Sequence, residues 1–315
     1  MTLGVRETTH RVVASARFVR IVPEALAGLA DALRASQPAL PNWNTTYHLD
    51  GEPEMVAHYL LLVDALNFCF WGDPKWSIDC RGERLDGYWA LAFAVKRAIQ
   101  SGVPLLDAAY LADMGLADLS QVLAGNVPIP LLDQRLKNAR EVGTVLLERY
   151  DGQIANLVDE ADGRAAGLVE RLVSDFTSFD DRADWHGVEV RFFKRAQLLA
   201  ADLVAANAVP PWSDANDLTA FADYQLPRVL RAFGVLEYAP ELAVRVDDRV
   251  ELSAGSDEEI EIRAATVQAC EQLRDVLHQR GRLVTAADVD CLLWTAAQSG
   301  LPDDRPYHRT RTIFY

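Results

Sequence analysis

The sequence lacks the glycine patterns and the metal-ligand spacings that mark many common enzyme chemistries. It contains no Gly-x-Gly, which excludes the dinucleotide-binding and P-loop fingerprints, and no Gly-x-Ser-x-Gly nucleophile elbow. No two cysteines form a Cys-x-x-Cys pair, and the histidines form no His-Glu-x-x-His pair, so zinc-ligand spacing is missing. We therefore expect neither a bound metal nor a cofactor.

Long apolar runs and a secretory leader are also missing. No hydrophobic segment approaches the roughly 18 residues of a membrane span. Residues 1–20 alternate apolar and charged side chains without the apolar core of a signal peptide. The four cysteines lie in apolar or aromatic contexts, which predicts reduced, buried thiols in a cytoplasmic protein: Cys69, Cys80, Cys270 and Cys291.

Charge is strongly biased toward the acidic side. The chain of 315 residues has 46 acidic and 31 basic side chains, a net charge of −15. A surface of this kind repels the phosphates of a long duplex, which argues against general nucleic-acid binding. A small anion can still bind in a locally basic pocket. We expect a monomer whose partner is a small molecule, with no contact to nucleic acid or membrane.

Helical periodicity dominates the sequence. Alternating apolar residues predict a short strand pair at 74–87 and a hairpin at 242–252. We predict a mainly α-helical protein with minor β hairpins, as a single domain over residues 1–315, with two helical lobes around a ligand pocket as one internal arrangement. The expected helices cover residues 18–36, 55–68, 88–101, 105–114, 116–123, 131–150, 153–159, 165–176, 188–204, 217–233, 256–281 and 289–299.

Aromatic residues are densest at 67–76, which contains Phe68, Phe70, Trp71 and Trp76. Flat apolar rings near an amide and a carboxylate suit the burial of a nucleobase. The same composition is typical of a helix that ends in a tightly packed turn. The residues alone leave both interpretations open.

A second informative segment surrounds Asp223, which lies between Phe221 and Tyr224 and four residues before Pro227. Because proline is favoured in the first turn of a helix, Asp223 is expected just ahead of a helix N-terminus. The helix dipole stabilises an ionised carboxylate there, and aromatic walls exclude water. A fixed anion of this kind can stabilise an oxocarbenium-like transition state. Simple capping of the helix is the alternative role.

Three other positions are candidates for ligand contact. Lys194 lies on an otherwise buried helix, where its ammonium either reaches solvent or faces a phosphate. The tail at 307–315 ends in an apolar, aromatic sequence and is expected to dock on the body of the protein. Its Arg309 and Arg311 either balance the acidic surface or contribute to an anion site. His48 is a weaker candidate, because a single histidine is more often structural.

These segments together resemble the queuosine salvage protein family, the queuosine 5′-phosphate N-glycosylases. The matches follow the same order over nearly the whole chain and include Asp290, just before Leu292-Leu293-Trp294. The motifs are Asn67-Phe68-Cys69-Phe70-Trp71, Phe193-Lys194-Arg195-Ala196-Gln197, Phe221-Ala222-Asp223-Tyr224 with Pro227, and His308-Arg309-Thr310-Arg311.

The resemblance implies a fold like that of the helical DNA glycosylases and a reaction on a free modified nucleotide. That reaction is hydrolysis of queuosine 5′-monophosphate to queuine and ribose 5-phosphate, which salvages a base used in tRNA modification. It implies that Asp223 is catalytic, as nucleophile or as stabiliser of the oxocarbenium ion. It places substrate contacts at His48, Phe221, Tyr224, Arg228, Val229, Asp290 and Lys194.

The chemistry of queuine agrees with a catalytic carboxylate. Queuine is a 7-deazapurine and lacks the N7 that many N-glycosylases protonate, so stabilisation of the sugar cation becomes more important. A carboxylate below C1′ provides it, either by trapping the sugar covalently or by shielding the cation until water adds. Asp290 is a candidate acceptor for the amino groups of the base.

Two other functions fit part of the pattern. A DNA or RNA base-excision glycosylase would share the fold and the aspartate, but is expected to have a basic face and a glycine-rich hairpin. A non-catalytic helical interaction module would account for the helices and the acidity. It would not account for an aspartate set between two aromatic residues ahead of a proline.

Overall fold

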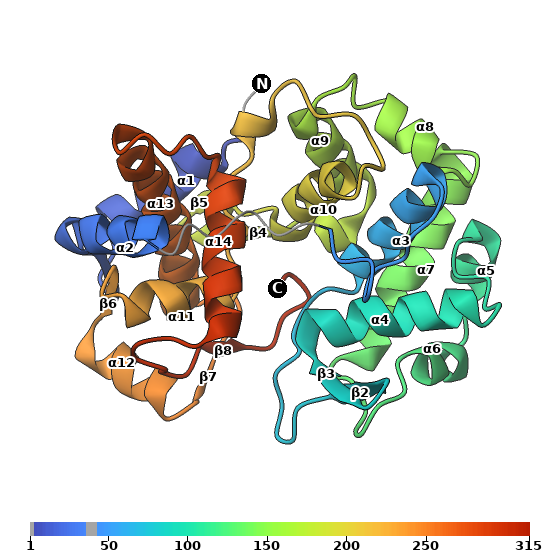
Figure 1. Ribbon diagram of the computed structural model, residues 1–315, viewed down its shortest axis with the longest axis horizontal. Coiled ribbons are helices and arrows are strands. Elements are labelled where there is room, and N and C mark those ends of the chain that lie inside the picture. Colours follow the sequence, from blue (N-terminus) through green and yellow to red (C-terminus); the bar gives the residue numbers. More distant parts are fainter. Residues whose placement is uncertain (1–2, 36–42) are drawn as a thin grey trace.

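The computed structural model describes residues 3–35 and 43–315, and within them the protein is mainly α-helical, as predicted (Figure 1). In the first part of the chain the helices are α1 Val5–Ala14, α2 Pro23–Ala35, α3 Pro53–Ala65, α4 Gly87–Gln100, α5 Ala108–Asp113, α6 Leu116–Val122, α7 Leu132–Arg149, α8 Ile154–Asp159 and α9 Ala165–Asp175. The later helices are α10 Lys194–Ala205, α11 Gln225–Ala232, α12 Pro240–Asp247, α13 Asp257–Gln279 and α14 Ala286–Ser299. None of these helices is both long and apolar enough to cross a membrane.

The β structure of the described residues consists of small two-stranded sheets. Strand β1 pairs antiparallel with β6, β2 with β3 and β4 with β5, whereas β7 and β8 are parallel. Two short 3-10 helices, η1 Thr177–Phe179 and η2 Ala215–Asp217, complete the regular structure. The strands are β1 Val19–Ile21, β2 Ser77–Cys80, β3 Glu83–Asp86, β4 Arg182–Trp185, β5 Val188–Arg191, β6 Leu236–Tyr238, β7 Glu251–Leu252 and β8 Arg309–Thr310.

Two large hydrophobic clusters form the interior. The first is built mainly from α3 to α10, with Leu60 and Leu168 among its fully buried members. The second is built from α2, β1, β6 and the helices α11 to α14, and includes Leu230. In Figure 1 these two groups of elements occupy the right and left halves of the view, and the C-terminus lies between them.

Helix α13 belongs to both clusters. Its residues Ile260, Ala264 and Val267 pack in the first cluster, and their spacing places them on one face of the helix. A different face points into the second cluster and is formed by Ile262, Ala265, Ala269, Cys270, Leu273 and Leu277. Because one continuous helix is buried on both sides, it fixes the two halves relative to each other.

The hairpin predicted at 242–252 is wrong. Residues Pro240–Asp247 form helix α12, and β7 pairs with the C-terminal tail instead of with a neighbouring strand. Proline at the first turn starts the helix. Leu242 and Val246, four residues apart, are buried on one face, whereas Val244 is 59% exposed. The alternation of apolar residues was thus part of a helical pattern.

Three predicted helices start later than expected. Residues 18–22 contain β1, and α2 begins at Pro23, while position 36 lies outside the described residues. The range 188–204 begins as strand β5, because His186 and Gly187, with φ of 54° and 79°, form the tight turn of the β4–β5 hairpin. The range 217–233 is helical only from Gln225. The strand pair predicted at 74–87 is present as β2 and β3.

Candidate active site

Asp223 lies in the loop that leads into α11 and binds the start of that helix. Its Oδ1 accepts hydrogen bonds from the backbone N–H groups of Gln225 at 2.7 Å and Leu226 at 3.0 Å. The predicted capping role is therefore present, and it fixes the carboxylate through one oxygen. Oδ2 makes no hydrogen bond within the described part of the chain. Burial raises the pKa of Asp223, while Lys194 and the two amides act in the opposite direction.

Asp290 of α14 lies close to Asp223 and binds the same loop. Its Oδ2 accepts the backbone N–H of Phe221 at 2.7 Å. Burial, and then the charge of Asp223, hold the pKa of Asp290 well above its usual range. Phe221 is 6% exposed, yet its ring belongs to none of the hydrophobic clusters. The structure thus brings three of the predicted residues together around one loop.

Lys194 comes from the other half of the molecule, at the first position of α10, and is 6% exposed. Burial is the main cause that lowers the pKa of Lys194, whereas the charges of Asp223, Asp64 and Asp290 raise it. Among residues 3–35 and 43–315, its ammonium makes no hydrogen bond or ion pair. Of the two alternatives for this lysine, the solvent-facing one is excluded, because the side chain is buried near the carboxylates.

Two further carboxyl groups of this site, those of Asp64 and Asp202, were missed in the sequence. Asp64 near the end of α3 is fully buried, and neither of its carboxyl oxygens makes a hydrogen bond of normal geometry with a described residue. Burial, and then the charge of Asp202, hold the pKa of Asp64 well above its usual range, while Lys194 and Asn67 act in the opposite direction. Burial raises the pKa of Asp202 in α10 to about 7. An aspartate directly after the apolar run 59–63 was the available signal for Asp64. The site therefore combines four carboxyl groups with one lysine.

His48 lies beside this acidic group and is held by three neighbours. Its ring stacks on Trp43 with centroids 3.9 Å apart, and its Nδ1 lies 3.1 Å from the carbonyl oxygen of Asn44. Its Nε2 lies 2.9 Å from the hydroxyl of Tyr88, which is 3.4 Å from Oδ2 of Asp202. Burial lowers the pKa of His48 to about 4, so the ring is neutral at pH 7. Since the carbonyl of Asn44 only accepts, Nδ1 donates and Nε2 accepts from Tyr88.

The remaining predicted contacts are oriented differently. The ring of Tyr224 packs against Tyr307 of the tail, with centroids 4.8 Å apart. Arg228 bonds to the tail through Asp304 and the carbonyl oxygen of Arg305. Val229 is fully buried in the second hydrophobic cluster. The side chains of Arg228 and Val229 are thus engaged within the protein, away from the carboxylates.

The aromatic segment at 67–76 is packed inside the protein, which favours the packing interpretation over an open base-binding surface. Phe68, Phe70, Trp71 and Trp76 are each at most 6% exposed. Arg135 lies 4.3 Å above the ring of Phe68 and donates to its carbonyl oxygen. At the end of α3, the buried guanidinium of Arg195 donates to the carbonyl oxygens of Asp64 and Ala65. The side-chain amide of Asn138 also donates to the carbonyl oxygen of Ala65.

The C-terminal tail docks on the body, as predicted. The backbone N–H of Cys69 donates to the carbonyl oxygen of Tyr315 at 2.9 Å, and the hydroxyl of Tyr315 donates to Glu259 at 2.8 Å. Arg309 and Arg311 lie over the ring of Trp71, at 5.5 and 4.6 Å from its centroid. The tail therefore joins the aromatic segment to helix α13.

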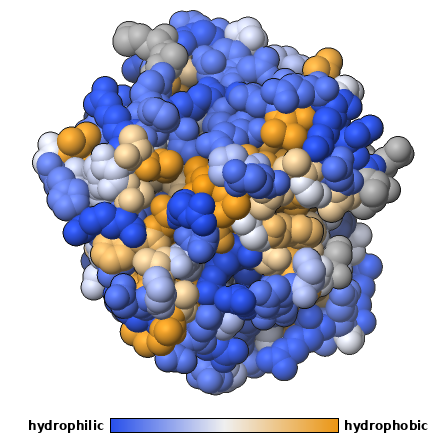
Figure 2. Space-filling model, turned by 90° about the vertical axis from the view of Figure 1, so that its left-hand side faces the viewer, coloured by the Kyte–Doolittle hydropathy of each residue, from blue (hydrophilic) through white to orange (hydrophobic). Residues whose placement is uncertain are grey.

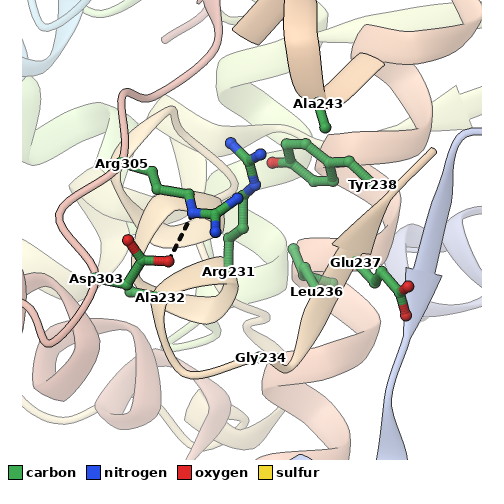
Figure 3. Close-up of a pocket in the computed structure, with 9 residues that line it drawn as sticks. All are labelled: Arg231, Ala232, Gly234, Leu236, Glu237, Tyr238, Ala243, Asp303 and Arg305. Atoms are coloured by element: carbon green, nitrogen blue, oxygen red, sulfur yellow. Dashed lines mark hydrogen bonds and ion pairs between the residues drawn. The ribbon is translucent and has the colours of Figure 1, made fainter. Parts of the chain in front are cut away.

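A pocket of about 330 Å³ lies away from these residues, where α11, β6 and α12 meet the tail (Figure 3). Its cations are already paired. Arg231 binds both oxygens of Asp247 at 2.7 and 3.1 Å, and Arg305 binds Asp303 at 2.6 Å. None of the predicted site residues lines this pocket, so we do not assign it to the reaction.

The described residues contain no group of three or more His, Cys, Asp or Glu side chains arranged to hold a metal ion. What the arrangement offers instead is a fixed carboxylate at a helix N-terminus, close to a buried lysine and a second buried carboxyl group. In a site with little water, a fixed anion stabilises a developing cation strongly, because no reorganisation is required during the reaction.

Comparison with known proteins covers the whole of this site. A family model described as queuosine salvage protein matches residues 47–315. A protein of Sphaerobacter thermophilus named queuosine 5′-phosphate N-glycosylase/hydrolase is 47% identical over 316 residues, which cover 99% of this chain and 98% of the relative. Proteins of the same name from Mus musculus and Dictyostelium discoideum are 32% and 33% identical; their alignments cover 99% of this chain and 99% and 98% of the relatives.

Proposed function

This chain belongs to the queuosine salvage protein family, and we propose that it hydrolyses the N-glycosidic bond of queuosine 5′-monophosphate. The products are queuine, which is salvaged, and ribose 5-phosphate. The names of relatives aligned over nearly the full length of this chain support the substrate and the reaction. The observation in the structure that supports it best is the carboxylate of Asp223, held at a helix N-terminus beside buried groups from both halves of the molecule.

In the proposed reaction Asp223 lies below C1′ of the ribose. As the bond from C1′ to the base nitrogen breaks, its electron pair leaves with the base, which takes up a proton, and positive charge develops on the sugar. The free Oδ2 of Asp223 stabilises that charge, either as an ion or by bonding to C1′. Water then adds its oxygen to C1′ and loses a proton; where Oδ2 had bonded to C1′, that bond breaks and its electron pair returns to the carboxylate.

The base is proposed to lie on the side of Phe221 and Asp290. Phe221 lies two residues before Asp223 and its backbone is bound by Asp290, so its ring is the proposed surface on which a planar base stacks. One carboxyl oxygen of Asp290 accepts the backbone N–H of Phe221, so the other oxygen can accept a hydrogen bond from an amino group of the base. His48 and Tyr224 are proposed as further contacts. Because the side chains of Arg228 and Val229 are engaged within the protein, these two residues are proposed to contact the substrate through their backbone groups.

The phosphate is proposed to interact with Lys194, with Arg309 and Arg311 as alternatives. Lys194 is the described cation that acts most strongly on Asp223, and its ammonium is not hydrogen-bonded to a described residue. The two arginines of the tail lie on Trp71, and Arg311 is also bound to Glu251 at 3.0 Å. We further propose one domain with two helical lobes and the ligand between them, because the candidate residues come from both halves.

The test is a comparison of three substrates with the purified protein. Release of queuine is measured by chromatography from queuosine 5′-monophosphate, from queuosine and from an oligoribonucleotide that contains queuosine. We expect the monophosphate to have the highest kcat/KM, because binding of a remote phosphate aligns the reacting bond, and the oligonucleotide to be inert. No release from any substrate would contradict the function, and release from the oligonucleotide alone would indicate a nucleic-acid glycosylase.

The same assay assigns the phosphate contact. With Lys194→Ala, kcat/KM should fall much more for the monophosphate than for the nucleoside, because both reactions lose the effect of Lys194 on Asp223 but only the monophosphate also loses a charge interaction with its phosphate. An equal proportional loss for both substrates would show that Lys194 acts on Asp223 or the base and leaves the phosphate to the tail. Arg311→Ala is the matched variant for that second case.

A further inference from the structure

A buried ion pair outside the proposed substrate contacts connects the two halves of the molecule. Arg263 of α13 donates from Nη1 and Nη2 to the two carboxylate oxygens of Asp181, at 2.9 and 2.6 Å. Asp181 lies just before β4, and each of the two residues is only 2% exposed. A bidentate guanidinium–carboxylate pair fixes orientation as well as distance, so it holds both partners in one geometry.

Each member of this pair also binds the backbone beside a candidate site residue. Arg263 Nε donates to the carbonyl oxygen of Ala222 at 3.2 Å, directly before Asp223. Oδ2 of Asp181 accepts the backbone N–H of Lys194 at 3.2 Å. One ion pair therefore bonds the loop that contains the carboxylate and the helix start that contains the lysine.

The guanidinium of Arg263 has little freedom to move. It lies between two rings, 3.9 Å from the centroid of Phe192 and 4.4 Å from that of Tyr315. The ring of Tyr315 is in turn held by its hydrogen bond to Glu259. A lysine at this position would keep the charge but lose the planar fork and the fixed bond to Ala222.

We infer that the Arg263–Asp181 ion pair positions Asp223 and Lys194 for the reaction, an inference that rests on the proposed function. Both residues act through the backbone at Ala222 and Lys194 and are positioning residues. Displacement of a catalytic group by about 1 Å lowers a rate by about 10². Loss of the pair should therefore reduce kcat while substrate contacts made by other side chains keep KM nearly unchanged.

The experiment measures kcat and KM for queuosine 5′-monophosphate with Arg263→Lys and with Asp181→Asn. We expect kcat to fall by about tenfold to a hundredfold in each variant, and KM to change by less than about threefold. Binding of queuine, followed by calorimetry, should remain close to that of the wild type. The unfolding temperature of each variant is measured in the same buffer.

The matched control is Arg231→Lys. Arg231 is also a buried arginine that binds both oxygens of an aspartate, Asp247. Its guanidinium lies 4.7 Å from the centroid of the ring of Tyr238, and Figure 3 shows these two side chains together. It lines the outer pocket and is not among the residues assigned to the reaction. We expect this variant to lose stability and to keep the kcat of the wild type.

Several results would overturn the inference. They are a kcat within twofold of wild type in either folded variant, a loss of kcat in Arg231→Lys equal to that in Arg263→Lys, or a rise in KM with kcat unchanged. If Arg263→Lys does not fold, the kcat of Asp181→Asn tests the inference instead, because that substitution keeps the size of the side chain. A wild-type protein that releases no queuine would contradict the proposed function. If the wild type is active and the two variants are equally active, only the positioning role of the Arg263–Asp181 ion pair is contradicted.

Discussion

Lys194 is the strongest of the groups that oppose the effect of burial on the pKa of Asp223. Burial alone would favour the neutral acid at this position, and Lys194 is the strongest of the influences that lower the pKa of Asp223. Arg263 acts in the same direction more weakly, whereas the charge of Asp223 is one of the causes that raise the pKa of Asp290. The lysine therefore helps to keep the carboxylate ionised, as stabilisation of a sugar cation requires.

A shift of the pH–rate profile tests this role. Asp223 must be ionised to act, so the acidic limb of kcat/KM follows its pKa. Lys194→Ala removes a charge that lowers this pKa, so the limb should move to higher pH and the loss of activity should be greater at pH 5.5 than at pH 8. An unchanged acidic limb would contradict the account. Lys137→Ala on the exposed face of α7 is the control and should leave the profile in place.

Site residues with unusual neighbours in the sequence could be predicted. Site residues that come together only through contacts between distant parts of the chain could not. Asp223 was recognisable because two aromatics and a proline surround it. Asp64 and Asp202 lie in helices whose sequences do not show that both carboxyl groups approach Lys194. The packing of α3 against α10 brings Asp64 close to Lys194 and Asp202, which are both in α10.

At the scale of elements, helices α5 and α7 approach each other closely at Gly143. A methyl group added at Gly143 would lie 2.4 Å from the carbonyl oxygen of Ala108 and 2.4 Å from the backbone nitrogen of Ala112. These atoms are backbone and cannot move independently of their helix. Glycine at this position therefore allows the two helices to pack directly against each other.

Gly143→Ala should destabilise the protein by about 1–3 kcal/mol, because the two helices must separate. Urea denaturation monitored by circular dichroism measures the effect. Gly28→Ala is the matched control, since Gly28 is an exposed helical position with no atom within 4 Å of the added methyl group. That variant should gain up to about 1 kcal/mol from helix propensity. Equal effects at the two positions would contradict the close approach of α5 and α7.

Helices with a sustained apolar period, such as α7 and α13, were predictable to within a few residues. Short elements were not. In α12 only Leu242 and Val246 are buried, so two turns of helix gave the same sparse pattern as a strand. The β4–β5 hairpin was missed because the turn at Gly187 was not recognised as a break in what was taken for a helix.

For the whole molecule, helix α13 explains why composition could indicate the fold class but not the position of the site. Its two apolar faces serve two clusters, so the halves meet along a shared helix. The sequence gives no direct sign of that arrangement. On the face seen in Figure 2, hydrophilic residues cover most of the upper and lower parts, and hydrophobic residues gather across the middle.

The proposed mechanism needs no metal, because the carboxylate of Asp223 acts on the sugar cation directly. Activity should therefore survive dialysis against EDTA, with kcat within twofold of the untreated protein. The control is the treated protein with magnesium or zinc added back. If chelation abolished queuine release and one divalent metal restored it, the mechanism would be wrong.

The most direct test of the account is the turnover of queuosine 5′-monophosphate by Asp223→Asn beside Asp214→Asn. Asp214 also binds two backbone amides at a helix start, those of Ala165 and Ala166, but lies outside the site. Asp223→Asn should remain folded and lose at least about 10² in kcat, because it removes a preorganised charge from the transition state. Asp214→Asn should keep the turnover of the wild type. Turnover by Asp223→Asn within twofold of wild type would contradict the central claim.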